Sequence, residues 1–171
     1  MVAPTLGSAT TALALLLTQG AYAAEVVGRV VGVSDGDTIT VLDSTKTQHK
    51  VRLGGIDAPE KGQPFGNRSQ QNLSRLVFNQ TVTVQWHKRD RYGRLVGTVY
   101  VEGNDAGLEQ VRAGMAWWYR RFANEQTPED RAIYEAAENT ARERKAGLWR
   151  DPYPVPPWEW RNEQRSAPEG A

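Results

Sequence analysis

At 171 residues, the chain has the length of one domain with its own hydrophobic core. Its 21 Lys and Arg residues nearly balance 20 Asp and Glu residues, and the net charge is +1. Any nucleic-acid binding must therefore come from a local patch rather than from the whole surface. The chain has no cysteine, which excludes disulfides and thiolate metal sites.

The first 24 residues carry no charged side chain. An apolar run at Thr11–Leu17 is followed by small residues at an A-x-A spacing around Ala23 and Ala24. This pattern predicts a secretory signal peptide over residues 1–24, cut near residue 24, and therefore a secreted or periplasmic protein. The basic residue that usually precedes such a run is missing. A membrane anchor is the alternative, but the run is too short to span a bilayer, and we expect no stable membrane insertion.

Five stretches alternate in the manner of strands: Glu25–Val33, Thr38–Asp43, Gln48–Leu53, Thr81–Lys88 and Leu95–Val101. Between the third and the fourth, Leu73, Leu76 and Val77 recur at helical spacing and predict a helix within Asn67–Asn79. Three strands, a helix and two strands follow the order of a five-stranded OB barrel. We therefore predict an α+β fold with an OB-fold β-barrel and three α-helices.

The other two predicted helices lie in the second half. The first is Asp105–Ala113, which Gly114 ends. The second is Pro128–Lys145, which Thr127 caps. On this second helix a stripe of small residues is expected to pack on the barrel, formed by Ala132, Ile133, Ala136, Ala137 and Thr140.

Residues 25–150 are predicted to form the folded domain, and residues 151–171 a tail that contains proline and tryptophan. A polyproline ligand has this composition. We predict instead that Trp158 and Trp160 fold back onto the domain. Residues beyond Arg161 are predicted to be disordered.

Four carboxylates are expected to approach one another in the barrel order. Asp35 and Asp37 lie in the turn after the first strand, while Asp57 and Glu60 follow the third. Taken alone, Asp-Gly-Asp-Thr is typical of a tight hairpin turn. Together the four groups repel one another unless a cation is present, and oxygen ligands favour Ca²⁺ or Mg²⁺. Asp37→Asn is then expected to melt in a chelator at the same temperature as the wild type or higher.

Arginines lie on the same predicted rim. Arg52 and Arg94 can bind phosphate in a forked geometry, and Arg89, Arg91 and Tyr92 add charge and an aromatic face. Taken alone, the turn Arg89–Arg94 is interpreted as a charged turn in solvent, and Arg52 as part of a salt bridge on the surface. An aromatic run is expected to lie mostly in the core, with one ring free to stack on a base: Trp117, Trp118, Tyr119 and Phe122. His49 and His87 are predicted to be structural.

Three segments together resemble the signatures of the thermonuclease (staphylococcal-nuclease-like) family, in order and in spacing. They are Asp35-Gly36-Asp37-Thr38, Arg52 with Ile56-Asp57-Ala58-Pro59-Glu60, and Asp90-Arg91-Tyr92-Gly93-Arg94. The resemblance extends from about Val26 to Trp149, and the Pro-Pro-Trp-Glu-Trp ending is similar to that of many secreted bacterial members. Each segment alone is a weak signal, but three at matching spacing are specific.

The resemblance implies a Ca²⁺-dependent nuclease that cuts DNA and RNA with little sequence preference. It implies direct Ca²⁺ ligation by Asp37 and Asp57 and by the backbone carbonyl of Ala58, with Asp35 near the ion. It assigns Glu60 to the attacking water and Arg52 and Arg94 to the phosphate. For substrate binding it implies Arg91, in place of the family's usual lysine, and Tyr92, while Tyr119 and Phe122 compete for the base-stacking position.

We predict a monomer that leaves 3′-phosphate ends. Two rival functions remain. One is a non-catalytic OB module that binds nucleic acid or protein, although the acidic and arginine positions are intact here. The other is a Mg²⁺ enzyme acting on small phosphate esters, which requires a closed pocket.

Overall fold

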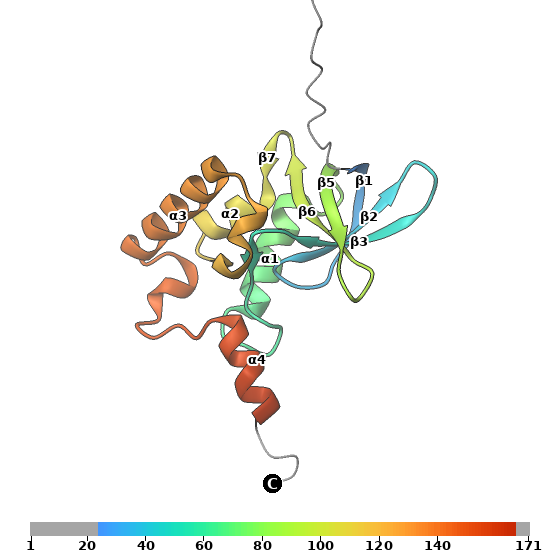
Figure 1. Cartoon of the computed structure of the whole chain (residues 1–171). Coiled ribbons are helices and arrows are strands. Elements are labelled where there is room, and N and C mark those ends of the chain that lie inside the picture. The colour runs from blue at the N-terminus through green and yellow to red at the C-terminus, as the bar shows by residue number, and fades with distance from the viewer. Residues whose placement is uncertain (1–23, 167–171) are drawn as a thin grey trace, which may run out of the picture.

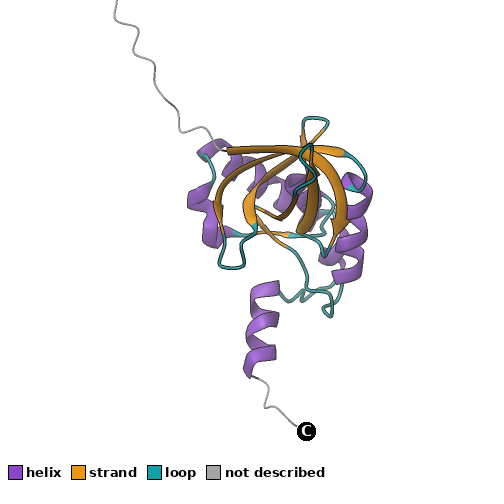
Figure 2. Cartoon of the chain, turned by 90° about the vertical axis from the view of Figure 1, so that its right-hand side faces the viewer, coloured by secondary structure: helices purple, strands orange, loops and turns teal. Residues whose placement is uncertain are grey.

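The computed structural model describes residues 24–166. Five strands close into a barrel: β1 (Ala24–Val33), β2 (Thr38–Asp43), β3 (Gln48–Leu53), β5 (Thr81–Arg89) and β6 (Leu95–Val101). They follow the order β3-β2-β1-β5-β6, and a parallel pairing of β3 with β6 completes the circle (Figure 2). This is the predicted OB-type α+β fold, and closure leaves no free edge between these strands.

A glycine makes the barrel seam possible. Gly97 on β6 pairs with Leu53 on one side and with Trp86 on the other. A Cβ atom at this position would lie 2.1 Å from the carbonyl oxygen of Gln85, which no side chain tolerates. Close backbone approach is a common reason for glycine inside a strand.

The barrel core follows the alternation of the strands. Inward-facing side chains that are at most 1% exposed include Val30, Ile39, Val41, Val51 and Leu53. Two helices cover this core with their apolar faces: α1 (Gly66–Val77) through Leu73 and Val77, and α2 (Ala106–Arg112) through Leu108 and Val111. Burying each such side chain contributes about 1.5–3 kcal/mol, so the sequence alternation is sufficient to define the barrel interior.

Short elements join the barrel to the helices. β4 (Ile56–Asp57) pairs antiparallel with β8 (Trp117–Trp118), and β7 (Asn104–Asp105) pairs with the end of β6. Two 3₁₀ turns follow β8 and the third helix, at Arg120–Glu125 and Gly147–Arg150.

The third helix, α3 (Pro128–Glu143), starts where the sequence predicts, because Thr127 Oγ1 accepts a hydrogen bond from the backbone N–H of Asp130 at 3.1 Å. The predicted packing stripe is wrong except at Ala137, which is partly buried against the core. The other four residues of the stripe are exposed: Ala132, Ile133, Ala136 and Thr140. The buried residues are Tyr134, Glu138 and Ala141.

Polar contacts explain this rotation of the helix. The Tyr134 hydroxyl donates to Asp105 at 2.6 Å, and Glu138 accepts from the backbone N–H of Trp118 at 3.1 Å. Glu138 also pairs with Arg120 at 2.7 Å. A fully buried glutamate with three partners was not expected from a pattern of apolar residues.

The tail folds back onto the domain through an additional helix, α4 (Pro157–Ser166), which stands apart from the barrel in Figures 1 and 2. Trp158 stacks on Tyr119, with ring centroids 5.3 Å apart, and contacts Trp117 edge-on at 6.3 Å. The predicted fold-back is therefore confirmed for Trp158. The prediction of disorder after Arg161 is wrong for residues 162–166, because α4 continues through them.

No helix within residues 24–166 is long and apolar enough to cross a membrane. The predicted signal peptide lies outside the described residues.

Candidate active site

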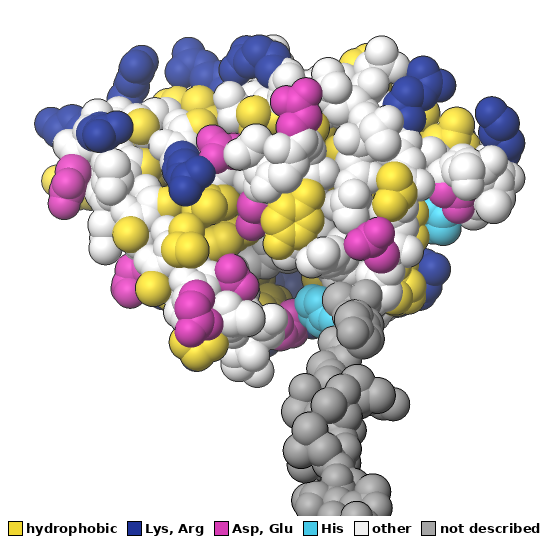
Figure 3. All heavy atoms as spheres, turned by 90° about the horizontal axis from the view of Figure 1, so that it is seen from above, with side chains coloured by type: hydrophobic (Ala, Val, Ile, Leu, Met, Phe, Trp, Pro, Cys, Tyr) yellow, Lys and Arg dark blue, Asp and Glu magenta, His cyan; other side chains and the backbone are white. Residues whose placement is uncertain are grey.

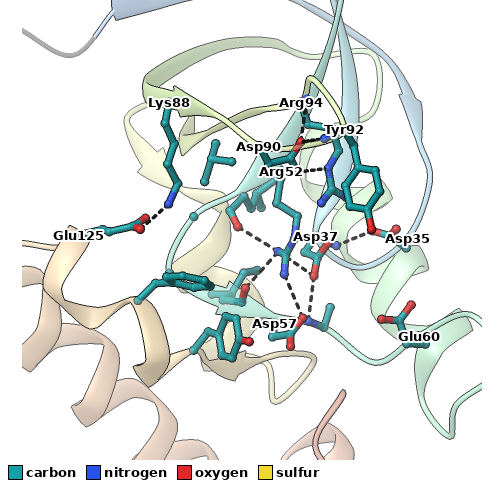
Figure 4. A pocket seen from close by; sticks show the side chains of 18 of the residues that line it. Asp35, Asp37, Arg52, Asp57, Glu60, Lys88, Asp90, Tyr92, Arg94 and Glu125 are labelled. Atoms are coloured by element: carbon teal, nitrogen blue, oxygen red, sulfur yellow. Dashed lines mark hydrogen bonds and ion pairs between the residues drawn. The ribbon is translucent and has the colours of Figure 1, made fainter. Parts of the chain in front are cut away.

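One open cleft of about 570 Å³ collects the side chains predicted to act in catalysis, metal binding and substrate binding, but not Arg89 (Figure 4). It lies where the β1–β2 turn, the end of β3 with β4, the β5–β6 turn and the 3₁₀ turn after β8 come together. The predicted residues that line it are Asp35, Asp37, Arg52, Asp57, Ala58, Glu60, Arg91, Tyr92, Arg94, Tyr119 and Phe122.

The β1–β2 turn is held by its own side chains and by the helices beneath it. Asp35 Oδ1 accepts from the backbone N–H of Asp37 at 3.0 Å. Gly36 is buried, and a Cβ atom there would lie 1.8 Å from Ser69 Oγ on α1. Its carbonyl accepts from Gln110 Nε2 on α2 at 2.7 Å. The Asp-Gly-Asp turn is therefore fixed in place before any ligand binds.

Arg52 stands between two of the carboxylates. Its Nη1 lies 2.9 Å from Asp37 Oδ2, and its Nη2 donates to Asp57 Oδ1 at 2.9 Å. Asp37 Oδ2 also accepts from the backbone N–H of Ala58 at 3.0 Å. The mutual repulsion expected from sequence is thus compensated by a buried arginine, which corrects the view that only a cation could relieve it.

Arg161 on α4 is the site residue that sequence reasoning missed. Its guanidinium lies 2.7 Å from Asp57 Oδ2 and 2.6 Å from Glu60 Oε1. The Asp57 side chain is only 1% exposed, whereas that of Arg161 is 38% exposed. The sequence signal was a basic residue directly after Trp-Glu-Trp, but 104 positions separate it from Asp57.

The acidic side of the cleft holds more negative charge than its arginines neutralise. Burial, followed by the charge of Asp37, raises the pKa of Asp35 to about 6. Burial also raises the pKa of Asp57, against the opposing effect of Arg161 and Arg52. These shifts indicate that an added positive charge near Asp35 would be favourable.

The oxygen atoms here match the chemistry of a hard divalent cation. Asp35, Asp37, Asp57 and the Ala58 carbonyl offer only oxygen, which suits Ca²⁺. Within residues 24–166, no three His, Cys, Asp or Glu side chains already surround an ion position. The guanidinium groups of Arg52 and Arg161 bridge the carboxylates instead. The donor set fits Ca²⁺, but Arg161 competes with an ion for Asp57.

The opposite wall of the cleft comes from the β5–β6 turn. Arg94 Nε donates to Asp90 Oδ2 at 2.6 Å. Burial alone would raise the pKa of Asp90, but the hydrogen bonds from Arg94 outweigh burial and lower that pKa. Tyr92 is 68% exposed and lies between two guanidinium groups, those of Arg91 at 4.8 Å and Arg94 at 5.4 Å from its ring centre. Of the Arg94 guanidinium nitrogens, only Nε contacts Asp90 within the described residues, so the two terminal nitrogens have the geometry to donate to a further anion.

The two candidate stacking rings differ in their surroundings. Tyr119 is stacked on Trp158, so one of its faces is covered. Phe122 contacts the Tyr119 ring edge-on at 5.2 Å and is 40% exposed. Lys88, which is paired with Glu125, lies 4.9 Å from the Phe122 ring centre. Phe122 therefore has more free ring surface than Tyr119.

Neither histidine lines the cleft. His49 lies 2.7 Å from Asp43, and His87 lies 3.1 Å from Glu125. Both contacts agree with a structural role.

Comparisons with known proteins point in one direction. A model of the family described as staphylococcal nuclease homologue matches residues 50–151. An Escherichia coli O157:H7 protein named "Uncharacterized endonuclease" is 46% identical over 140 residues, which cover 81% of this chain and 87% of that protein. A Shigella flexneri protein named "Micrococcal nuclease" is 42% identical over 165 residues, or 91% of each chain. A Haemophilus influenzae protein also named "Uncharacterized endonuclease" is 40% identical over 137 residues, covering 80% of this chain and 74% of the relative.

Proposed function

Because this chain belongs to the staphylococcal nuclease family, we propose that it is a Ca²⁺-dependent nuclease that hydrolyses phosphodiester bonds of DNA and RNA. The observation that carries the proposal is the cleft itself. Carboxylates from the β1–β2 turn and β4 lie on one side, and the arginine of the β5–β6 turn lies on the other. Cleavage of a phosphodiester uses a cation and arginine contacts to phosphate, and the carboxylate oxygens on one side and Arg94 on the other support this proposal.

The proposed reaction is an in-line attack of water on phosphorus, with loss of the 5′-oxygen and a 3′-phosphate left behind. Glu60 orients and deprotonates the water. Its backbone N–H donates to Gln63 Oε1 at 3.1 Å, and its carboxylate contacts Arg161, so two partners hold it at the cleft edge. General-base catalysis of this kind contributes about 10²–10⁴ in rate.

Arg94 binds the phosphate, and Arg94 and Arg52 together stabilise its developing charge. Arg94 uses the terminal nitrogens that Asp90 leaves free. Arg52 already contacts Asp37 and Asp57, so it positions these carboxylates and adds positive potential at the phosphate. A guanidinium does not release its proton near neutral pH, so neither arginine acts as the acid for the leaving oxygen.

Asp37, Asp57 and the Ala58 carbonyl would hold the Ca²⁺ ion, with Asp35 beside it. When bound, the ion supplies positive charge to the scissile phosphate and favours deprotonation of the attacking water. Arg91 and Tyr92 contact a neighbouring phosphate. A base stacks on Phe122 or on the free face of Tyr119.

We also propose that the protein acts outside the cytoplasm as a monomer, after removal of residues 1–24. The charge-free apolar leader supports export. Mass spectrometry of natively expressed protein is expected to find a mature chain starting within a few residues of Glu25. An intact Met1 would contradict export.

Two observations weigh against the rivals. A non-catalytic OB module has no need of a glutamate placed beside an aspartate pair, whereas Glu60 and Asp57 share Arg161 here. A small phosphate ester calls for an enclosed pocket, whereas the cleft here is open and has room for a chain.

The reaction is tested by the ends it produces. DNA and RNA oligonucleotides that carry a fluorophore rather than a phosphate at the 5′ end are incubated with protein and Ca²⁺. The products are then treated with a phosphatase that removes terminal phosphate. We expect products that lose a 3′-phosphate and then migrate more slowly in a gel. Products with 3′-hydroxyl ends would contradict the proposed leaving group.

A further inference from the structure

A second groove of about 530 Å³ continues from the cleft beneath α4. One wall is the segment from Trp117 to Arg121, the other is α4, and α3 contributes Arg142. The two hollows share the side chains of Tyr119 and Arg161. The groove therefore adjoins the catalytic cleft at these two side chains.

The groove is lined by cationic side chains. Its arginines are Arg120, Arg121, Arg142, Arg161 and Arg165, and among the described residues no Asp or Glu lines it. Glu138 lies 2.7 Å from Arg120 and 3.4 Å from Arg142, and its single charge offsets one of the two. Within residues 24–166, neither Arg121 nor Arg165 has an acidic partner, and both are exposed. The groove therefore carries a local excess of positive charge on a chain whose net charge is only +1.

The opposite face of the molecule provides a contrast. Figure 3 shows the face on the side away from α4. On that face Lys and Arg gather along the upper and left edges, and Asp and Glu are scattered from the edges to the middle. Side chains of both signs are therefore present on that face, whereas the groove is lined by arginines.

Aromatic rings accompany these arginines. Tyr119 and Trp158 are stacked with an interplanar angle of 17°, and the Trp118 ring lies 4.3 Å below the Arg120 guanidinium. Trp118 is buried beneath Arg120, and Tyr119 and Trp158 each cover one face of the other, so bases can contact only the remaining faces of Tyr119 and Trp158. Proteins that bind single-stranded nucleic acid combine phosphate-binding cations with aromatic rings on which bases stack. An acidic peptide would use the charge but would leave the rings unused.

We propose that this groove binds the nucleotides that flank the scissile phosphate on the same strand, with Arg121 and Arg165 contacting backbone phosphates. The inference rests on the proposed nuclease function and extends it: the tail helix α4 becomes part of the substrate-binding surface. Arg161 anchors α4 at the catalytic end through Asp57 and Glu60. Long strands are then better substrates than dinucleotides, because only long strands reach the groove.

Two matched double variants distinguish an effect of the groove residues from an effect of the protein's net charge. The groove variant is Arg121→Ala with Arg165→Ala. The control is Arg75→Ala with Arg144→Ala, which removes the same charge from exposed positions that line neither hollow. For each protein, kcat/KM is measured with a thymidine dinucleotide and with a single strand of about 12 thymidines, a length within the range that one OB-fold domain binds.

In the groove variant we expect the ratio of kcat/KM for the long strand to that for the dinucleotide to fall about tenfold, with little change in the control. Salt dependence gives a second readout. In a Glu60→Gln background, which allows binding to be measured without cleavage, the slope of log K against log salt is expected to become shallower by about 1.4, or about 0.7 for each lost phosphate contact.

The outcomes distinguish the two proposals. If the wild-type protein cleaves neither substrate, the proposed nuclease function fails. If it cleaves both, and the groove and control variants show the same ratio and the same slope, the groove assignment is overturned while the nuclease function stands. A glutamate-rich peptide of equal charge that displaces the 12-nucleotide strand as well as nucleic acid does would overturn the assignment to nucleic acid.

Discussion

Replacing Arg161 with methionine tests the contact that joins α4 to the catalytic carboxylates. Methionine keeps most of the side-chain length but removes the charge. A hydrogen bond to a charged group contributes about 1.5–3 kcal/mol. The pair with Glu60 is worth less, about 0–1 kcal/mol, because Arg161 and Glu60 are 38% and 41% exposed. Asp57 is buried but keeps Arg52 as a partner. The expected loss is therefore about 2 kcal/mol in a chelator.

For a chain of this length, such a loss corresponds to a fall of about 4–8 °C in the melting temperature. Calcium affinity is expected to move in the opposite direction. Arg161 and the ion compete for Asp57, so removing Arg161 lets the ion bind up to about tenfold more tightly, the equivalent of about 1.4 kcal/mol. Thermal melts in chelator and calorimetric titration with Ca²⁺ measure the two effects separately.

Arg165→Met is the matched control, because Arg165 lies one turn further along α4 and contacts Asn162 rather than a carboxylate within the described residues. It is expected to change neither the melting temperature nor the Ca²⁺ affinity appreciably. If Arg161→Met behaves like Arg165→Met in both measurements, the Arg161 contacts do not hold the tail at the site and the reasoning is refuted.

Three further predictions follow from the cleft. Glu60→Gln is expected to lower kcat by about a hundredfold or more at nearly unchanged substrate affinity, and turnover within a few-fold of wild type would remove Glu60 from the mechanism. In chelator, Asp37→Asn is expected to lose about 2 kcal/mol of unfolding free energy and to melt at a lower temperature, because Arg52 loses one of its two carboxylate partners. A melting temperature equal to or above that of the wild type would show that repulsion between the carboxylates dominates. With the pKa of Asp35 raised from 3.8 to about 6, the folded protein keeps a proton that the unfolded chain has already lost, so stability falls as pH rises through this interval. In chelator, the melting temperature of Asp35→Asn relative to that of the wild type is therefore expected to be higher at about pH 7 than at about pH 4. The same difference in melting temperature at both pH values would contradict the raised pKa.

The barrel and most of the site could be predicted from sequence because both depend on local patterns. Period-two alternation defined the five strands, and short polar segments at strand ends brought Asp37 and Asp57 to one rim. The N-terminus of α3 was also predictable, since a cap residue, a proline and acidic residues occur together there.

What could not be predicted depends on buried polar partners far apart in the chain. Glu138 lies in the interior only because Trp118, Arg120 and Arg142 satisfy it, and a pattern of apolar residues contains no trace of such partners. Arg161 likewise reaches Asp57 only because Trp158 docks against the aromatic run. Composition alone suggested a disordered end to the tail, whereas packing and ion pairing order it.

The most direct test of the account is incubation of the purified protein with supercoiled plasmid DNA, in parallel with its Glu60→Gln variant. Each is assayed with Ca²⁺ and with a calcium chelator. We expect the wild type to nick and then degrade the plasmid in Ca²⁺, the chelator to stop cleavage, and added Ca²⁺ to restore it. The Glu60→Gln variant is expected to remain folded and to be at least about a hundredfold slower. Cleavage that persists in the chelator, or equal rates for the two proteins, would contradict a calcium-dependent nuclease centred on these carboxylates.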